Sequence, residues 1–263
     1  MTLQEHASER RLIDRRTVVR GAAVAAWTVP AVQLVGAAPA FAGSGPTSFS
    51  GLSGSGSYST PSRLLLLVSF NNAGASPATG VQVTVKMPRA MPSAPTAAGW
   101  NVSGSGDTFV FTLNATVPAG QSQSLQADFT VSDTTIEGTA AVALTATNVT
   151  GTSNTNAPIT PAYKVSYSGP TVSNVTGNRR VSVTAIDNIG SLAGVLRVAL
   201  TLDRARTLVG GAPSGWSHQA SNGNRTHTFT RGPFGPSDSV VACEPVFDGN
   251  LMVTSHSVTI TAS

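Results

Sequence analysis

The 263-residue chain has little charge and a single cysteine. Charged residues make up 11% of it, less than half the share usual in soluble domains. The lone cysteine, Cys243, excludes an intramolecular disulfide. Its apolar surroundings, residues 239–243, predict a buried thiol rather than a reactive one. Runs of helix-favouring residues are nearly absent after residue 42, whereas 26 glycines and 16 prolines are present. This balance predicts strands joined by turns.

The common catalytic motifs are also missing. The sequence has no Gly-x-Ser-x-Gly elbow, no His-Glu-x-x-His, no Cys-x-x-Cys and no phosphate-binding Gly-x-x-x-x-Gly-Lys. Residues 43–160 contain no histidine. We therefore expect a protein that is not an enzyme and that uses no cofactor, with a hydrolase as the least favoured alternative.

Charge is unevenly distributed along the chain. Residues 1–42 carry five arginines and three acidic residues, residues 43–160 three basic and four acidic, and residues 161–263 eight basic and five acidic. The segments therefore have net charges of +2, −1 and +3. No aromatic residues are interleaved with the arginines, so we expect no nucleic-acid partner. A solvated strand face is the favoured interpretation for the second-half arginines, and contact with an anionic cell-wall polymer is the alternative. These arginines are Arg179, Arg180, Arg197, Arg204, Arg206, Arg225 and Arg231.

The first 42 residues have the three parts of an export signal. A polar region ends at Arg20, a weakly apolar stretch runs over residues 21–36, and the small-x-small sequence Ala40-Phe41-Ala42 predicts cleavage between Ala42 and Gly43. The apolar stretch is too short and too interrupted for a good membrane span. We also expect no membrane span in the mature chain, and no C-terminal sorting motif is visible in the sequence.

The basic part of this segment resembles a twin-arginine signal peptide. Arg15 and Arg16 match the arginine pair, Val18 and Val19 the apolar positions, and Arg20 the following basic residue. The resemblance implies a bacterial protein that is exported already folded, to the cell envelope or the medium.

The mature part contains an internal repeat. Ser48-Phe49-Ser50-Gly51 recurs as Ser166-Tyr167-Ser168-Gly169, and four further matches follow at offsets of 115–116 residues. The further matches pair Asn72-Ala73-Gly74 with Asn188-Ile189-Gly190, Gly99-Trp100 with Gly215-Trp216, Pro118-Ala119-Gly120 with Pro233-Phe234-Gly235, and Thr145-Ala146 with Thr261-Ala262. Units of this size fit one β-sandwich each. The Ser/Gly-rich stretches 50–60 and 168–178 are expected to be long loops.

Two hairpins are predicted at equivalent places. Turns at Ser105-Gly106 and Asn222-Gly223 would place Trp100 opposite Phe111 and Trp216 opposite Phe229. The favoured interpretation is that the two tryptophans are buried core residues. The alternative is that they are exposed and form platforms for sugar rings.

The second hairpin also brings His218 opposite His227. Two imidazoles supply half of a zinc or copper site. A polar pair near a hairpin tip is the favoured interpretation, with the pair as a weak metal candidate.

The segment from Asn71 to Val85 resembles the bacterial surface repeat of the DUF11 type, an immunoglobulin-like module. It has the Asn-x-Gly turn, an Ala-Thr-Gly-Val segment, an alternating strand and Met87-Pro88 in place of the family's Leu-Pro. The similarity covers residues 60–148. The second unit keeps Asn188, Gly190 and Gly194. Such modules are usually extracellular spacers or adhesive units, and they bring no catalytic residues.

The sequence therefore predicts an all-β protein with two immunoglobulin-like antiparallel β-sandwiches in tandem. The expected parts are a signal peptide (1–42), a first module (43–148), a linker (149–163) and a second module (164–263). The expected function is an exported structural or adhesive one, and the alternative is an accessory pair that binds carbohydrate or cell-wall polymer. Candidate partners are such a polymer, a carbohydrate or another surface protein.

Overall fold

A computed structural model describes residues 47–262. The twin-arginine motif at Arg15 and Arg16 and the expected cleavage between Ala42 and Gly43 lie outside the described residues. The described chain is all-β, as predicted, and it contains no helix that is long and apolar enough to cross a membrane.

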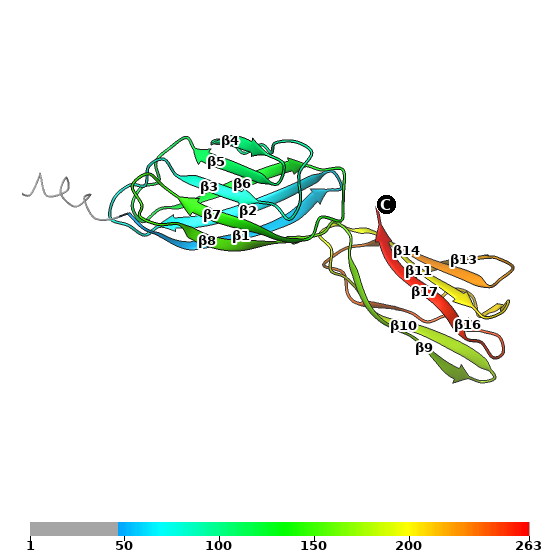
Figure 1. The fold of residues 1–263 in the computed structure, drawn as a ribbon. Helices are drawn as coiled ribbons and strands as arrows, with labels where there is room; N and C mark the ends of the chain where they lie inside the picture. Colours follow the sequence, from blue (N-terminus) through cyan, green and yellow to red (C-terminus); the bar gives the residue numbers. More distant parts are fainter. Residues whose placement is uncertain (1–46, 263) are drawn as a thin grey trace, which may run out of the picture.

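The first half of the described chain holds eight strands (Figure 1). They are β1 (Phe49–Thr60), β2 (Arg63–Asn72), β3 (Gln82–Lys86), β4 (Trp100–Ser105), β5 (Thr108–Leu113), β6 (Ser122–Thr130), β7 (Gly138–Thr145) and β8 (Ser153–Thr160). They form one sheet in the order β4-β5-β3-β7-β8-β1-β2-β6. Phe109 on β5 and Phe129 on β6 touch edge to face, with ring centroids 5.5 Å apart. Because β5 and β6 lie near opposite ends of that order, the sheet folds over its own core.

The second half holds nine strands in separate sheets. They are β9 (Val165–Val175), β10 (Asn178–Asn188), β11 (Gly194–Leu202), β12 (Leu208–Val209), β13 (Ser217–Ser221), β14 (Thr226–Phe234), β15 (Val241–Cys243), β16 (Val246–Phe247) and β17 (Val253–Thr261). One sheet has the order β13-β14-β11-β17, and the other contains β12, β16, β10 and β15 with β9 beside β10.

The strand pairings of the two halves correspond. In the first half β2 lies between β1 and β6, and in the second half β10 lies between β9 and the β15–β16 segment. Likewise β3 pairs with β5 and β7 as β11 pairs with β14 and β17, and the β4–β5 hairpin matches β13–β14. In the first half, β8 joins the two groups of strands by pairing with β7 and β1.

Alternation along the strands fills two hydrophobic cores. In β2, Leu64, Leu66, Val68 and Phe70 point inward, and in β11 Leu196, Val198, Leu200 and Leu202 do the same. Each half therefore has a core of its own.

Residues 149–163, expected to be a linker, contain strand β8. Ala157 and Ile159 on β8 are buried in the first core. Asn154 and Asn156 are exposed on the outward side of this strand, and the polar Thr155 lies on the inward side. Only Ala157 and Ile159 therefore mark the buried face, and two apolar positions were too few to indicate a strand.

The expected loop at residues 50–60 is instead β1, and its counterpart is β9. The glycines of β1 have a packing role here. A Cβ on Gly54 would lie 2.8 Å from the Cβ of Ala157, and one on Gly56 would lie 2.9 Å from Ile159. The glycines therefore permit β8 to approach β1 closely.

Candidate functional sites

A buried asparagine closes the same turn in both halves. Asn72 Nδ2 donates to the carbonyls of Ser76 (2.8 Å) and Val117 (2.9 Å), and Asn72 Oδ1 accepts from Gly74 N (3.0 Å). Asn188 makes the matching bonds to Leu192 O (2.9 Å), Phe234 O (2.9 Å) and Gly190 N (2.9 Å). The backbone bond from Ala73 N to Ser48 O likewise recurs from Ile189 N to Lys164 O. The structure thus shows one set of contacts twice, about 116 residues apart.

Both repeated tryptophans are buried, with 6% of Trp100 and 7% of Trp216 exposed. Trp216 Nε1 donates to Ala242 O at 3.0 Å, which satisfies the indole donor inside the core. Neither ring is available as a platform for a sugar, so the core interpretation of these residues holds.

The first hairpin differs from the prediction by one residue. Its turn is at Gly106-Asp107, which pairs Trp100 with Leu113 and Val102 with Phe111. The carbonyls of this turn accept hydrogen bonds from Met87 N and Met91 N, each at 2.7 Å. These contacts from a distant loop fix the turn, and the local sequence does not encode them.

The second hairpin has a four-residue turn, residues 222–225, rather than two residues. Its carbonyls accept from Arg206 N and Leu202 N. The register therefore shifts by two, so that His218 pairs with Phe229 and Ala220 with His227, while Trp216 precedes β13.

His218 and His227 nevertheless meet, now as diagonal neighbours. Their rings stack with centroids 5.2 Å apart, and His218 Nε2 lies 3.0 Å from His227 Nδ1. His227 Nε2 lies 3.0 Å from Asn224 O, and since a carbonyl only accepts, this nitrogen carries the proton. His227 Nδ1 is then the acceptor and His218 Nε2 the donor.

Burial lowers the pKa of both histidines. His227 is 1% exposed and packs against Phe247, with ring centroids 4.6 Å apart. Both ring nitrogens of His227 and Nε2 of His218 thus have hydrogen-bond partners when the pair is neutral. No cluster of three His, Cys, Asp or Glu side chains suited to a metal occurs within residues 47–262. Metal binding by the pair stays the less favoured interpretation, and no contact among the described residues tests it.

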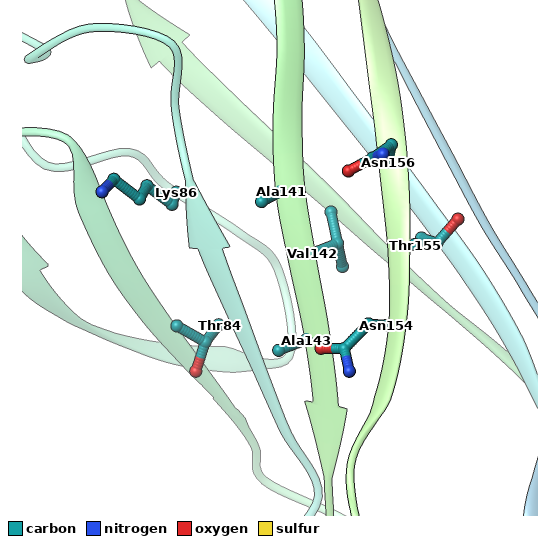
Figure 2. A pocket seen from close by; sticks show the side chains of 8 residues that line it. All are labelled: Thr84, Lys86, Ala141, Val142, Ala143, Asn154, Thr155 and Asn156. Atoms are coloured by element: carbon teal, nitrogen blue, oxygen red, sulfur yellow. The ribbon is translucent and has the colours of Figure 1, made fainter.

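A groove on the outer face of the first half was not predicted (Figure 2). It has a volume of about 300 Å³. Ala141 and Ala143 on β7 form its floor, and the larger side chains of β3 and β8 rise on either side. Register places Lys86, Ala141 and Asn156 in one row across the strands, and Thr84, Ala143 and Asn154 in the next. The groove offers amide and ammonium groups but no aromatic ring.

The seven second-half arginines lie in three places. Arg197 and Arg231 lie on the paired strands β11 and β14. Four of the others, Arg179, Arg204, Arg206 and Arg225, lie beside the start of β10, the end of β11 and the β13–β14 turn, the strand ends farthest from the junction with the first half. Arg180 follows Arg179 on β10 and therefore faces the other side of that strand.

Cys243 is fully buried, as its apolar surroundings predicted. Burial raises the pKa of its thiol to about 12. A thiol with so little thiolate at neutral pH is a poor nucleophile.

Comparisons with known proteins assign no family to the chain. No protein-family description matches it, and no curated protein matches it. Two solved structures with some likeness are those of a GH20 exo-β-N-acetylglucosaminidase from Vibrio harveyi, one of an inactive mutant and one in complex with N-acetylglucosamine. Their TM-scores are 0.31 and 0.30, at 8% and 9% sequence identity. The match covers 76% of this chain and 40% of each of those chains. The chain thus spans less than half the length of these structures, and at such TM-scores no functional argument follows.

Proposed function

We propose that this chain is an exported structural or adhesive protein of the bacterial envelope or extracellular space, built from two immunoglobulin-like modules and without enzymatic activity. A duplication as the origin of the two modules is supported by two observations. The strand pairings of the halves match, and the contacts of Asn72 recur at Asn188. Antiparallel strands folded over a separate core in each half support the sandwich architecture.

The observation that carries the structural role is the junction between the halves. Ser191 Oγ accepts from Tyr58 N at 3.1 Å and donates to Pro161 O at 3.0 Å. Ser191 N also donates to Pro161 O, and Leu192 N donates to Ala162 O, each at 2.9 Å. The turn held by Asn188 is therefore bonded to the end of the first half.

Packing reinforces these hydrogen bonds. Ala162 is fully buried in the first core, and Leu192 from the second half packs against that same core. Tyr163 contacts both cores. A Cβ on Gly190 would lie 2.7 Å from both Ala162 O and Lys164 N, so only glycine fits this approach. Such a junction suits a stiff spacer, because flexible tandem modules are joined by polar linkers with few contacts.

The alternative is a module pair that binds carbohydrate or wall polymer. Burial of Trp100 and Trp216 removes the support for its carbohydrate part, since stacking on sugar requires exposed rings. The adhesive interpretation does not depend on exposed tryptophan, and we therefore favour it.

Export remains part of the proposal and rests on Arg15 and Arg16. Replacing both with lysine should retain the precursor inside a bacterium that has a functional twin-arginine system. We expect the unaltered chain outside the cytoplasm, accessible to protease on intact cells. Continued export of the Arg15→Lys, Arg16→Lys precursor would contradict the twin-arginine assignment.

The role itself is tested by attachment under flow. Cells that export the chain should attach to a surface or to one another more strongly than cells that retain the lysine precursor. A junction variant, Gly190→Ala, should be exported and yet attach less well. A structural or adhesive role would be contradicted if exporting and retaining cells attached equally well and if their envelopes resisted osmotic lysis equally.

A further inference from the structure

The end of the second half that faces away from the first carries a connected cluster of arginines. We call this region the distal tip and define it as residues 203–207, 222–225 and 248–252 together with Arg179. The loops are bonded to one another: Asp203 N donates to Met252 O, Asp203 Oδ1 accepts from Met252 N, and Arg206 N donates to Asn224 O.

The arginine side chains are held by these same loops. Arg179 donates from Nε and Nη2 to Asn250 Oδ1, at 3.0 and 2.8 Å. Arg225 Nη2 donates to Asp203 O at 3.1 Å. The Arg206 guanidinium lies over Gly249, where a Cβ would be 2.9 Å from Nη1. The cationic groups are thus positioned by the fold rather than free to swing in solvent.

The tip has more positive charge than its own acidic groups neutralise. It contains four arginines and two aspartates, Asp203 and Asp248, a net charge of +2. Asp203 forms an ion pair with Arg204 at 3.0 Å, and Asp248 Oδ1 accepts from Thr207 N at 2.8 Å. Within residues 47–262, Arg179, Arg206 and Arg225 have no carboxylate at ion-pair distance.

One of these guanidinium groups also has an orphan donor. Arg206 Nε is buried and has no hydrogen-bond partner among the described residues. A buried donor without an acceptor costs roughly 1–3 kcal/mol. An anion at the outer nitrogens of the Arg206 guanidinium would balance its charge, which no carboxylate of the described residues does at ion-pair distance.

The chemistry of the tip favours phosphate groups. All of its cationic residues are arginines, whose planar guanidinium donates two parallel hydrogen bonds to a phosphate. The amides of Asn222, Asn224 and Asn250 lie among them and are exposed, which suits hydroxyl groups between the phosphates. The tip has no aromatic residue on which a nucleic-acid base would stack. Its one exposed large apolar side chain, Met252, is too little for insertion into a membrane.

We propose that the distal tip binds a linear phosphodiester polymer that carries hydroxyl groups, such as a polyol phosphate. This site deepens the proposed adhesive function and rests on it for its biological meaning. It places the adhesive contact at the outer end of the second module, with the first module as the spacer.

The test measures binding of the full purified chain to inorganic polyphosphate and to a glycerol-phosphate oligomer over a range of salt. The tip variant is Arg204→Glu with Arg225→Glu, since both side chains are exposed. The matched control is Arg197→Glu with Arg231→Glu, which changes net charge equally away from the tip. Each variant should unfold at the same temperature as the unaltered chain, which shows that neither has lost the fold.

We expect the tip variant to bind about tenfold more weakly, or worse, for each arginine replaced. The slope of log K on log salt should fall by about one for each phosphate group that the variant no longer neutralises. The control variant should keep most of the affinity. Equal weakening in the two variants would overturn the proposal, as would no binding of the unaltered chain at about 50 mM salt.

Two comparison ligands test the identity of the partner. Tighter binding to single-stranded DNA, or to phosphatidylglycerol vesicles, than to the glycerol-phosphate oligomer would overturn the assignment to a hydroxyl-bearing polyol phosphate. Because the measurement uses purified protein, its failure leaves the attachment result of exporting cells intact. Failure of the attachment assay would equally leave the binding result standing.

Discussion

Replacement of Asn188 by alanine should destabilise the second half without changing its fold. The side chain is 2% exposed and makes three hydrogen bonds to backbone groups. Alanine leaves two carbonyls and one N–H without these partners. At about 1 kcal/mol for each hydrogen bond removed, the free energy of unfolding of the second half should fall by about 2–4 kcal/mol.

Asn72→Ala is the matched variant, because it removes the same three bonds from the first half. We expect a decrease of similar size, confined to the first half. Asn188→Ala should in addition loosen the junction, since Leu192 in the same turn packs on the first core.

Urea unfolding read by hydrogen exchange of peptides from each half separates the two effects. A decrease well under 1 kcal/mol in the corresponding half for both variants would refute the reasoning. So would a destabilisation by Asn188→Ala that appeared only in peptides from the first half.

Three further predictions concern other buried groups. Trp216→Phe should remove the bond to Ala242 O and lower the free energy of unfolding by about 1–2 kcal/mol; a variant as stable as the parent in urea would show that this bond contributes nothing. Burial lowers the folded-state pKa of His218 and His227, so their contribution to stability is complete above the ordinary value of 6.5 and is lost as pH falls through the lowered folded values. The His218→Gln, His227→Gln double variant should therefore show a flatter melting temperature between pH 7 and 5, and an unchanged slope would contradict this. Cys243, with a pKa of about 12, should react with an aromatic disulfide reagent at pH 8 only after unfolding; rapid labelling of the native protein would be inconsistent with its burial.

Strand character could be predicted from sequence where apolar residues alternate over several positions. Val81 to Met87 and Val195 to Leu202 show this alternation and correspond to β3 and β11. Strand β1 escapes such a prediction because glycine and serine have low strand propensity. There the glycines serve the close approach of β8, a contact that depends on residues about 100 positions away.

In the candidate sites, too, features set by neighbouring residues could be predicted, whereas features set by residues distant in sequence could not. The asparagine turns are visible as repeated Asn-x-Gly sequences, and the hairpin pattern predicts that the two histidines meet. The predicted register of that hairpin was wrong because Asn224 O and Arg225 O accept hydrogen bonds from the segment 202–206. The distal tip and the groove at Lys86 bring together loops or strands that are distant in sequence, and no local pattern marks them.

The central claim, that the halves form one stiff unit through the Ser191 junction, is tested most directly by nitrogen-15 NMR relaxation of the full chain. We predict a single rotational correlation time for the ordered residues of both halves, set by the size of the whole molecule. In Gly190→Ala, where the added Cβ opposes the close approach to Ala162 and Lys164, the halves should begin to tumble separately. Two shorter, distinct correlation times in the unaltered chain would contradict the account.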